Sequence, residues 1–153
     1  MVGFKRRVII TLLAVEFAGN SQASLVDRGN GLLYDDVLNL TWLQDANYAK
    51  TSGYSSTGKM DWISANNWAA NLNYQGLTGW RLASNTPING ISFNINSGYN
   101  DYNGVADNSY NITSPHSELA YMYYVNLNLK GHYDTVGNYQ SDFGTMAMVP
   151  MMG

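Results

Sequence analysis

Hydrophobic residues in this chain come in short groups, and the spacing within each group predicts the element that it forms. Residues 32–34 make one apolar group and residues 37–43 a second, on either side of Asp35 and Asp36. Because paired acidic residues favour a turn, we expect two short strands joined at this pair. Residues 50–60 are rich in Ser, Thr, Gly and Tyr and are expected to form a loop.

A first helix is predicted over residues 61–73. Asp61 can serve as its N-cap, because a carboxylate accepts hydrogen bonds from the unpaired N–H groups of the first turn. Four apolar residues recur at helical spacing: Trp62, Ala65, Ala69 and Leu72. Residues 78–82 then predict a turn and a short strand. Because large aromatic side chains supply much of a small core, we expect four tryptophans in or near it: Trp42, Trp62, Trp68 and Trp80.

A second helix is predicted to begin near Ser114. Ser114 can cap it, Pro115 occupies a first-turn position where its missing N–H costs nothing, and Glu118 interacts favourably with the helix dipole. Five residues follow at helical spacing: Leu119, Met122, Tyr123, Asn126 and Leu129. Gly131 can end this helix.

The first 23 residues have the three-part pattern of a secretory signal peptide. Basic residues 5–7 precede an apolar stretch over residues 8–18, and Ala23 is a small residue suited to cleavage. The stretch is shorter than the roughly 20 apolar residues that span a bilayer. We therefore expect a mature chain from residue 24 in the extracellular space, the periplasm or the cell envelope. The alternative is a buried N-terminal helix of a cytosolic protein.

Composition limits the function further. A length of 153 residues favours one domain, and only 12% of the residues are charged. Removal of residues 1–23 leaves five basic and ten acidic residues, a net charge of −5, which argues against a nucleic-acid partner. The absence of Cys excludes disulfide scaffolds, thiolate metal sites and cysteine nucleophiles. The mature sequence has no second long apolar run, so we expect no membrane span in it.

Specific sequence strings resemble a bacterial family, the Lcl C-terminal-like domain. The resemblance lies in residues 27–35, 40–49, 68–72, 79–82 and 117–124, and extends over about residues 25–144. Many relatives with this opening are similar to exported proteins with a PEP-CTERM sorting tail. The resemblance implies an α+β, C-type-lectin-like fold near the sulfatase-modifying domains, with two helices on a twisted antiparallel sheet and long irregular loops.

The chain departs from the family pattern in two places. Ala83 stands where relatives usually have Pro, and relatives continue after Gly144 with further strands. We therefore expect a signal peptide (1–23), the N-terminal part of the family domain (24–144) and an unassigned tail (145–153). An incomplete sheet would leave an unpaired edge and exposed apolar surface.

The long polar segment over residues 87–112 holds the candidate binding residues. Asp101, Asn103 and Asp107 could supply oxygen ligands to Ca²⁺, the one cofactor that the sequence suggests. The alternative is a solvated turn, in which Asp, Asn and Gly are the usual residues.

Tyrosines and an asparagine of the same segment suit carbohydrate. Tyr99, Tyr102 and Tyr110 offer faces on which sugar CH groups stack, and Asn103 offers an amide for hydroxyl groups. The alternative is that these tyrosines pack within the loop. The sequence leaves the oligomeric state open.

No catalytic constellation is visible in the sequence. The resemblance implies no formylglycine-generating activity here, because those enzymes act through cysteines. His116 and His132 are expected to be polar surface or capping residues. We therefore expect an exported, non-catalytic binding or matrix module with a glycan or extracellular polymer as partner. The alternatives are a sulfatase-modifying or carboxylate-based hydrolytic enzyme, with Glu118 as an early suspect, and a non-functional fragment.

Overall fold

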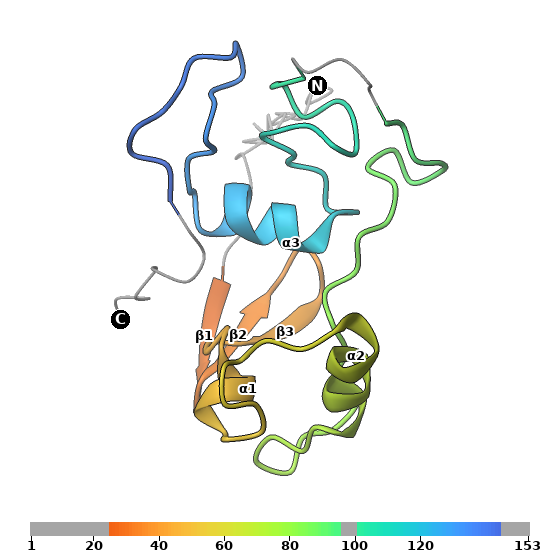
Figure 1. Cartoon of the computed structure of the whole chain (residues 1–153), viewed down its shortest axis with the longest axis vertical. Helices are drawn as coiled ribbons and strands as arrows, with labels where there is room; N and C mark the ends of the chain where they lie inside the picture. Colours follow the sequence, from red (N-terminus) through yellow and green to blue (C-terminus); the bar gives the residue numbers. More distant parts are fainter. Residues whose placement is uncertain (1–24, 96–100, 145–153) are drawn as a thin grey trace, which may run out of the picture.

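The structure, a computed structural model, describes residues 25–95 and 101–144, and it is a mixed α+β protein (Figure 1). The predicted signal peptide (1–23), Tyr99 and the tail (145–153) lie outside the described residues. Three strands, β1 (Leu25–Gly29), β2 (Leu32–Asp35) and β3 (Leu40–Leu43), form an antiparallel sheet in the order β1-β2-β3. Strand β1 is an addition to the two strands that the apolar pattern predicts.

Polar residues with special backbone geometry make the two turns of the sheet. Asn30 lies between two glycines at the β1–β2 turn, and all three have positive φ angles. At the β2–β3 turn, Oδ1 of Asp35 accepts hydrogen bonds from the N–H groups of Val37 (3.0 Å) and Leu38 (2.9 Å). The predicted hairpin at the acidic pair is therefore confirmed, with Leu33 paired to Trp42 in its register.

Helix α2 (Trp62–Asn71) matches the first predicted helix, and Asp61 is its N-cap, with Oδ1 2.8 Å from the N–H of Ser64. The short helix α1 (Tyr48–Thr51) overlaps the start of the segment predicted as a loop. Ala69 is the buried residue of α2, whereas Trp62 is 76% exposed. The prediction that Trp62 lies in the core is therefore wrong, because the helix turns this position away from the sheet.

The second predicted helix is shorter than expected. Helix α3 (Glu118–Tyr121) continues directly as a π-helix, η1 (Met122–Asn126). Ser114 does not cap it, because the helix begins only at Glu118 and the N-cap position is Ser117; the Ser114 hydroxyl donates to the carbonyl of Ile88 at 2.7 Å and accepts from the N–H of His116 at 3.3 Å. The predicted helical face is also wrong at Leu119, which is 51% exposed.

Residues 78–82 form no strand, so the strand predicted there is wrong. Trp80 instead closes a local turn, in which its indole N–H donates to the carbonyl of Leu77 at 3.0 Å. Residues 101–116 and 131–144 are irregular, in agreement with the predicted long loops. In Figure 1 the α3–η1 helix lies between the sheet and these two segments.

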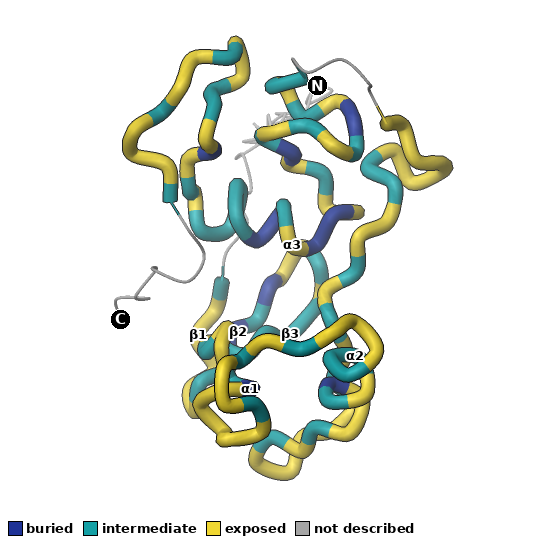
Figure 2. The backbone as a smooth tube through the Cα atoms, in the orientation of Figure 1, coloured by how far each residue is buried: buried dark blue, intermediate teal, exposed yellow. Residues whose placement is uncertain are grey.

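The buried apolar core is small and extends from the sheet into the irregular segments (Figure 2). Its members are Leu33, Ala49, Ala69, Ala106, Ile112, Tyr121 and Met122. Asp35 is fully buried beside it, and its Oδ2 accepts a hydrogen bond of 2.5 Å from the amide of Asn126. This bond joins the β2–β3 turn to η1. Across the described ranges, none of the helices combines the length and the apolar character that a bilayer crossing needs.

Candidate functional site

Six aromatic rings from the two irregular segments form one continuous network, which we call the aromatic cluster. Its members are Tyr102, Tyr110, His132, Tyr133, Tyr139 and Phe143. Tyr133 lies at the centre, with ring centroids 5.1 Å from Tyr102, 5.3 Å from Tyr110 and 5.2 Å from His132. His132 extends the network to Phe143 at 4.5 Å and to Tyr139 at 5.0 Å. Rings that are far apart in the sequence therefore share one surface.

Two of the residues proposed for sugar binding belong to this cluster. Tyr102 and Tyr110 are stacked, with centroids 6.0 Å apart and ring planes inclined by 25°. Asn103 is exposed, and its Oδ1 accepts a hydrogen bond from the N–H of Val105 at 3.3 Å. The sequence reasoning missed the four rings between residues 132 and 143. The signal that could have found them was the return of Tyr, Asn, Gly and Asp in that stretch.

Asn111 holds the two irregular segments together beneath the rings. Its side-chain amide donates to the carbonyl of Tyr102 at 2.7 Å and to the carbonyl of Tyr133 at 2.9 Å. Its own backbone has a φ of 58°, a conformation that Asn adopts more readily than most residues. One side chain therefore fixes the backbone positions of two cluster members.

Gly137 packs directly against the ring of Tyr102. A Cβ atom at this position would lie 2.7 Å from Cε2 of Tyr102, and the φ of +91° is one that side chains with a Cβ rarely adopt. The neighbouring turn is organised by Asp134, which accepts hydrogen bonds from the N–H groups of Val136 (3.0 Å) and Asn138 (2.8 Å). Hydrogen bonding from the Asn138 side chain lowers the pKa of the Asp134 carboxyl, so it is held as the carboxylate.

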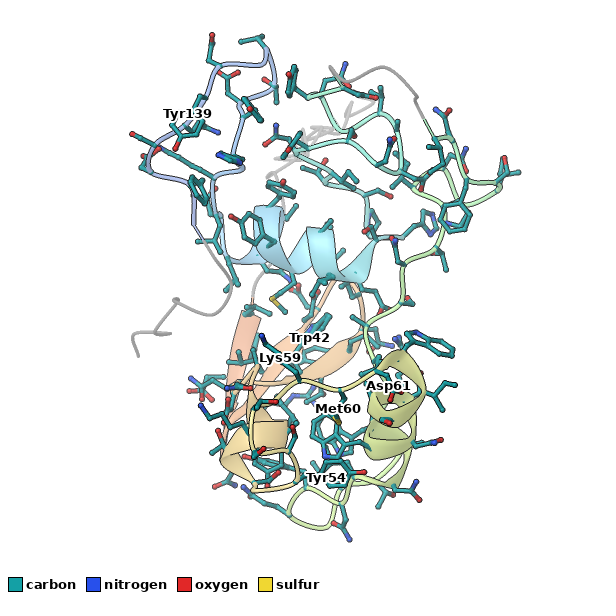
Figure 3. All side chains as sticks on the ribbon, in the orientation of Figure 1. Trp42, Tyr54, Lys59, Met60, Asp61 and Tyr139 are labelled. Atoms are coloured by element: carbon teal, nitrogen blue, oxygen red, sulfur yellow. The ribbon has the colours of Figure 1, made fainter. Side chains whose placement is uncertain are left out.

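The outer rings of the cluster are accessible. Tyr139 is 59% exposed, Phe143 40% and Tyr110 37%, whereas Tyr102 and Tyr133 are half-buried. Figure 3 shows Tyr139 on the loop of residues 131–144, at the end of the molecule away from α1 and α2. The half-buried rings of Tyr102 and Tyr133 therefore support the exposed rings around them.

Of the three residues proposed for calcium, Asn103 and Asp107 accept backbone hydrogen bonds, whereas Asp101 has an oxygen without a partner. Asp107 accepts backbone hydrogen bonds at both oxygens, from Ile88 (2.8 Å, Oδ1) and from Asn94 (2.6 Å, Oδ2). One oxygen of Asp101, Oδ2, is buried without a hydrogen-bond partner in the described part of the chain. Among residues 25–95 and 101–144, no three side chains of His, Cys, Asp or Glu come together as a metal site would need. Asp107 therefore has a visible role in joining loop segments.

Glu118 has a different role from the one expected of a first-turn acid. Its carboxylate binds the guanidinium of Arg81 through two contacts, of 2.6 and 2.7 Å, and accepts the N–H of Ser84 at 2.7 Å. The Arg81 hydrogen bonds are the largest cause of a lowered pKa at Glu118. The pair ties α3 to the segment that follows α2. This gives Glu118 the environment of a structural carboxylate, since a general acid needs a raised pKa.

Comparisons with protein-family models, with curated proteins and with solved structures gave no match. The resemblance to the Lcl C-terminal-like domain therefore remains a prediction from the sequence strings.

Proposed function

We propose that this protein is a non-catalytic binding module that holds carbohydrate against the aromatic cluster. The observation that carries the proposal is the network of six rings, with exposed faces at Tyr110, Tyr139 and Phe143. Pyranose rings present CH groups that pack on aromatic faces, while tyrosine hydroxyls exchange hydrogen bonds with sugar hydroxyls. The contacts of Asn111 and Gly137 support this role, because rings already fixed lose less entropy on binding.

The cellular setting belongs to the same proposal. The signal-peptide pattern of residues 1–23 supports export, and the partner is then a glycan or a polymer of the cell surface or matrix. The C-type-lectin-like fold is also part of the proposal. This fold is supported by the sequence resemblance and by the long irregular segments that contain the aromatic cluster.

The test is binding of the mature chain to a panel of soluble polysaccharides (dextran, xylan, laminarin and alginate) by affinity electrophoresis. We expect at least one polymer to retard the protein, and the double variant Tyr139→Ala/Phe143→Ala to reduce retardation about tenfold, a loss of roughly 1.4 kcal/mol. Tyr54→Ala is the matched control, because Tyr54 is 62% exposed but lies in the α1–α2 loop, away from the cluster.

Two results would contradict the proposal. One is a folded wild-type chain that no polysaccharide or glycan array retains. The other is an equal loss in the Tyr54→Ala control, which would show that the retention is unspecific.

Calcium is tested in the same assay. Because both oxygens of Asp107 already accept backbone hydrogen bonds, we propose that the cluster binds its ligand without a metal ion. Retardation and melting temperature should then be the same in CaCl₂ and in EDTA. A loss of either on chelation would restore the calcium hypothesis.

A further inference from the structure

Strand β3 is flanked by two adjoining cavities, which together we call the β3 groove. Their volumes are about 340 and 390 Å³. Both are lined by Thr41 and Trp42 of β3 and by Trp80, Arg81 and Ala83 of the segment that follows α2. The groove is separate from the aromatic cluster, none of whose members lines either cavity.

The first cavity is mainly apolar. Its walls come from β3, α2, η1 and the residues that directly follow these two helices, and they include Leu43, Trp68, Leu72, Met122 and Leu127. A cavity of this size between three elements accepts several aliphatic side chains, and apolar lining of this kind is typical of binding pockets.

The backbone of β3 is available on the side of the groove. The sheet order places β3 at an edge, and no other strand of the described chain pairs with it. An edge strand presents a row of N–H and C=O groups that can pair with a further strand. The occupant that satisfies these groups is an extended peptide, whose alternate side chains would point into the cavity.

The second cavity carries a positive charge suited to an acidic residue. Arg28 and Arg81 both line it, together with Glu118. Glu118 is already paired to Arg81, so the unneutralised cation is Arg28. The guanidinium of Arg28 lies 3.8 Å above the ring of Tyr34, and none of the ion pairs found among the described residues includes it.

We propose that the β3 groove binds an extended peptide segment of another protein by adding a strand to β3. Apolar side chains of that segment fill the first cavity, and an Asp or Glu faces Arg28 in the second. The four residues of β3 span about 13 Å, so the paired part of the peptide is roughly four to six residues long.

Fluorescence polarisation with a labelled synthetic peptide tests this. The probe alternates Val or Leu with Thr and carries one Asp near an end. We expect saturable binding to the full chain, and at least a tenfold loss when alternate amide nitrogens of the probe are methylated. Methylation keeps the side chains but removes the N–H groups that strand addition needs. Equal binding of the methylated probe would overturn the proposal.

A charge reversal tests the role of Arg28. The Arg28→Glu variant should bind the Asp probe about tenfold more weakly than the wild type does. It should bind a probe with Lys in place of Asp more tightly than it binds the Asp probe. Lys50→Glu is the matched control, because Lys50 is an exposed cation on α1 that lines neither cavity. No difference between the two variants would contradict the placement of the acidic side chain opposite Arg28.

Size-exclusion chromatography distinguishes a peptide of another protein from a second copy of this chain as the occupant of the groove. A monomer that binds the probe supports the proposal. A dimer that dissociates on the Arg28→Glu change would show that a second copy of this chain fills the groove, and would overturn it.

Discussion

Glu118 and Asp35 show how much a buried carboxylate depends on partners that are distant in the sequence. Glu118 is 37 residues from Arg81, and Asp35 is 91 residues from Asn126. The sequence predicts a turn at Asp35 because turn formation is local. It does not predict the Arg81 contact of Glu118, because nothing in the spacing of these residues brings them together. Glu118 does lie in the first turn of α3, as predicted, but this position does not account for its hydrogen bonds with Arg81 and Ser84.

At Glu118 we predict that the isosteric change Glu118→Gln lowers the free energy of unfolding by about 1.5–3 kcal/mol, because Arg81 and the Ser84 N–H lose a charged acceptor. Urea unfolding measures the change. The control is Asp142→Asn, which removes the partner of Lys130 from an exposed ion pair and should leave the transition almost unchanged. Equal effects in both variants would contradict the structural role of the Arg81 pair.

The pH dependence of the same pair has a defined sign. The folded-state pKa of Glu118 is lowered from its ordinary 4.5, so its stabilisation is present above pH 4.5 and is lost as the pH falls through the lower folded value. The unfolding free energy of the wild type should therefore approach that of Glu118→Gln in acid. Curves that remain parallel from neutral to acidic pH would disprove this.

At the scale of elements, local signals were sufficient for the hairpin and for α2, and insufficient for α3. Asp61 caps α2 through a contact three residues away, so its role follows from the sequence. Ser114 is an equally good N-cap by residue type, but its hydroxyl binds Ile88, 26 residues away, and the helix begins later. Residue type alone therefore does not fix where a helix begins, because the backbone before α3 is bonded to residues 84–86 instead of continuing the helix.

For α2 we predict that Asp61→Ala lowers the melting temperature, because the N–H of Ser64 loses its acceptor. Asp61→Asn is the control, since an amide oxygen can still cap the helix, and it should recover most of the loss. Thermal unfolding by circular dichroism gives both values. A destabilisation by Asn as large as that by Ala would argue against capping as the cause.

For the loop of residues 131–144 we predict that Gly137→Ala weakens polysaccharide binding and lowers stability by about 1–2 kcal/mol from backbone strain alone. Gly53→Ala is the control, because Gly53 also has a positive φ, of +78°, but nothing lies near the position of its Cβ. Both variants should therefore lose stability, whereas only Gly137→Ala should displace the Tyr102 ring and reduce binding. Equal binding by the two variants would remove Gly137 from the site.

At the scale of the whole molecule, the sheet and the C-terminal segments are joined through few buried groups. Asp35 accepts two backbone N–H groups of its own turn and the amide of Asn126 in η1. The apolar pattern predicted helices and strands in the same chain, and the mixed α+β class was what the resemblance implied. Only two of the six cluster members, Tyr102 and Tyr110, were predicted, because they are close in sequence, whereas Tyr133 reaches them through tertiary packing and Tyr139 contacts Tyr133.

We predict that Asp35→Ala destabilises the whole chain by about 3 kcal/mol, since it leaves buried donors of the turn and of Asn126 without an acceptor. Asp36→Ala is the control at the exposed neighbouring position, where the change leaves the contacts of Asp35 in place, and it should cost much less than Asp35→Ala. Chemical denaturation followed by circular dichroism decides the result. Similar losses in both variants would show that the turn, and not the buried carboxylate, is the sensitive feature.

The distribution of aromatic residue types has a practical consequence. All four tryptophans lie between residues 42 and 80, three of them on the walls of the β3 groove, whereas the aromatic cluster holds only Tyr, Phe and His. Indole emission excited beyond the tyrosine absorption band therefore comes from these three groove residues and from the exposed Trp62, and a Trp62→Phe variant limits it to the groove. The cluster contributes no indole, so a compound that changes this emission in the Trp62→Phe variant has reached the groove, and one that binds without changing it has bound elsewhere.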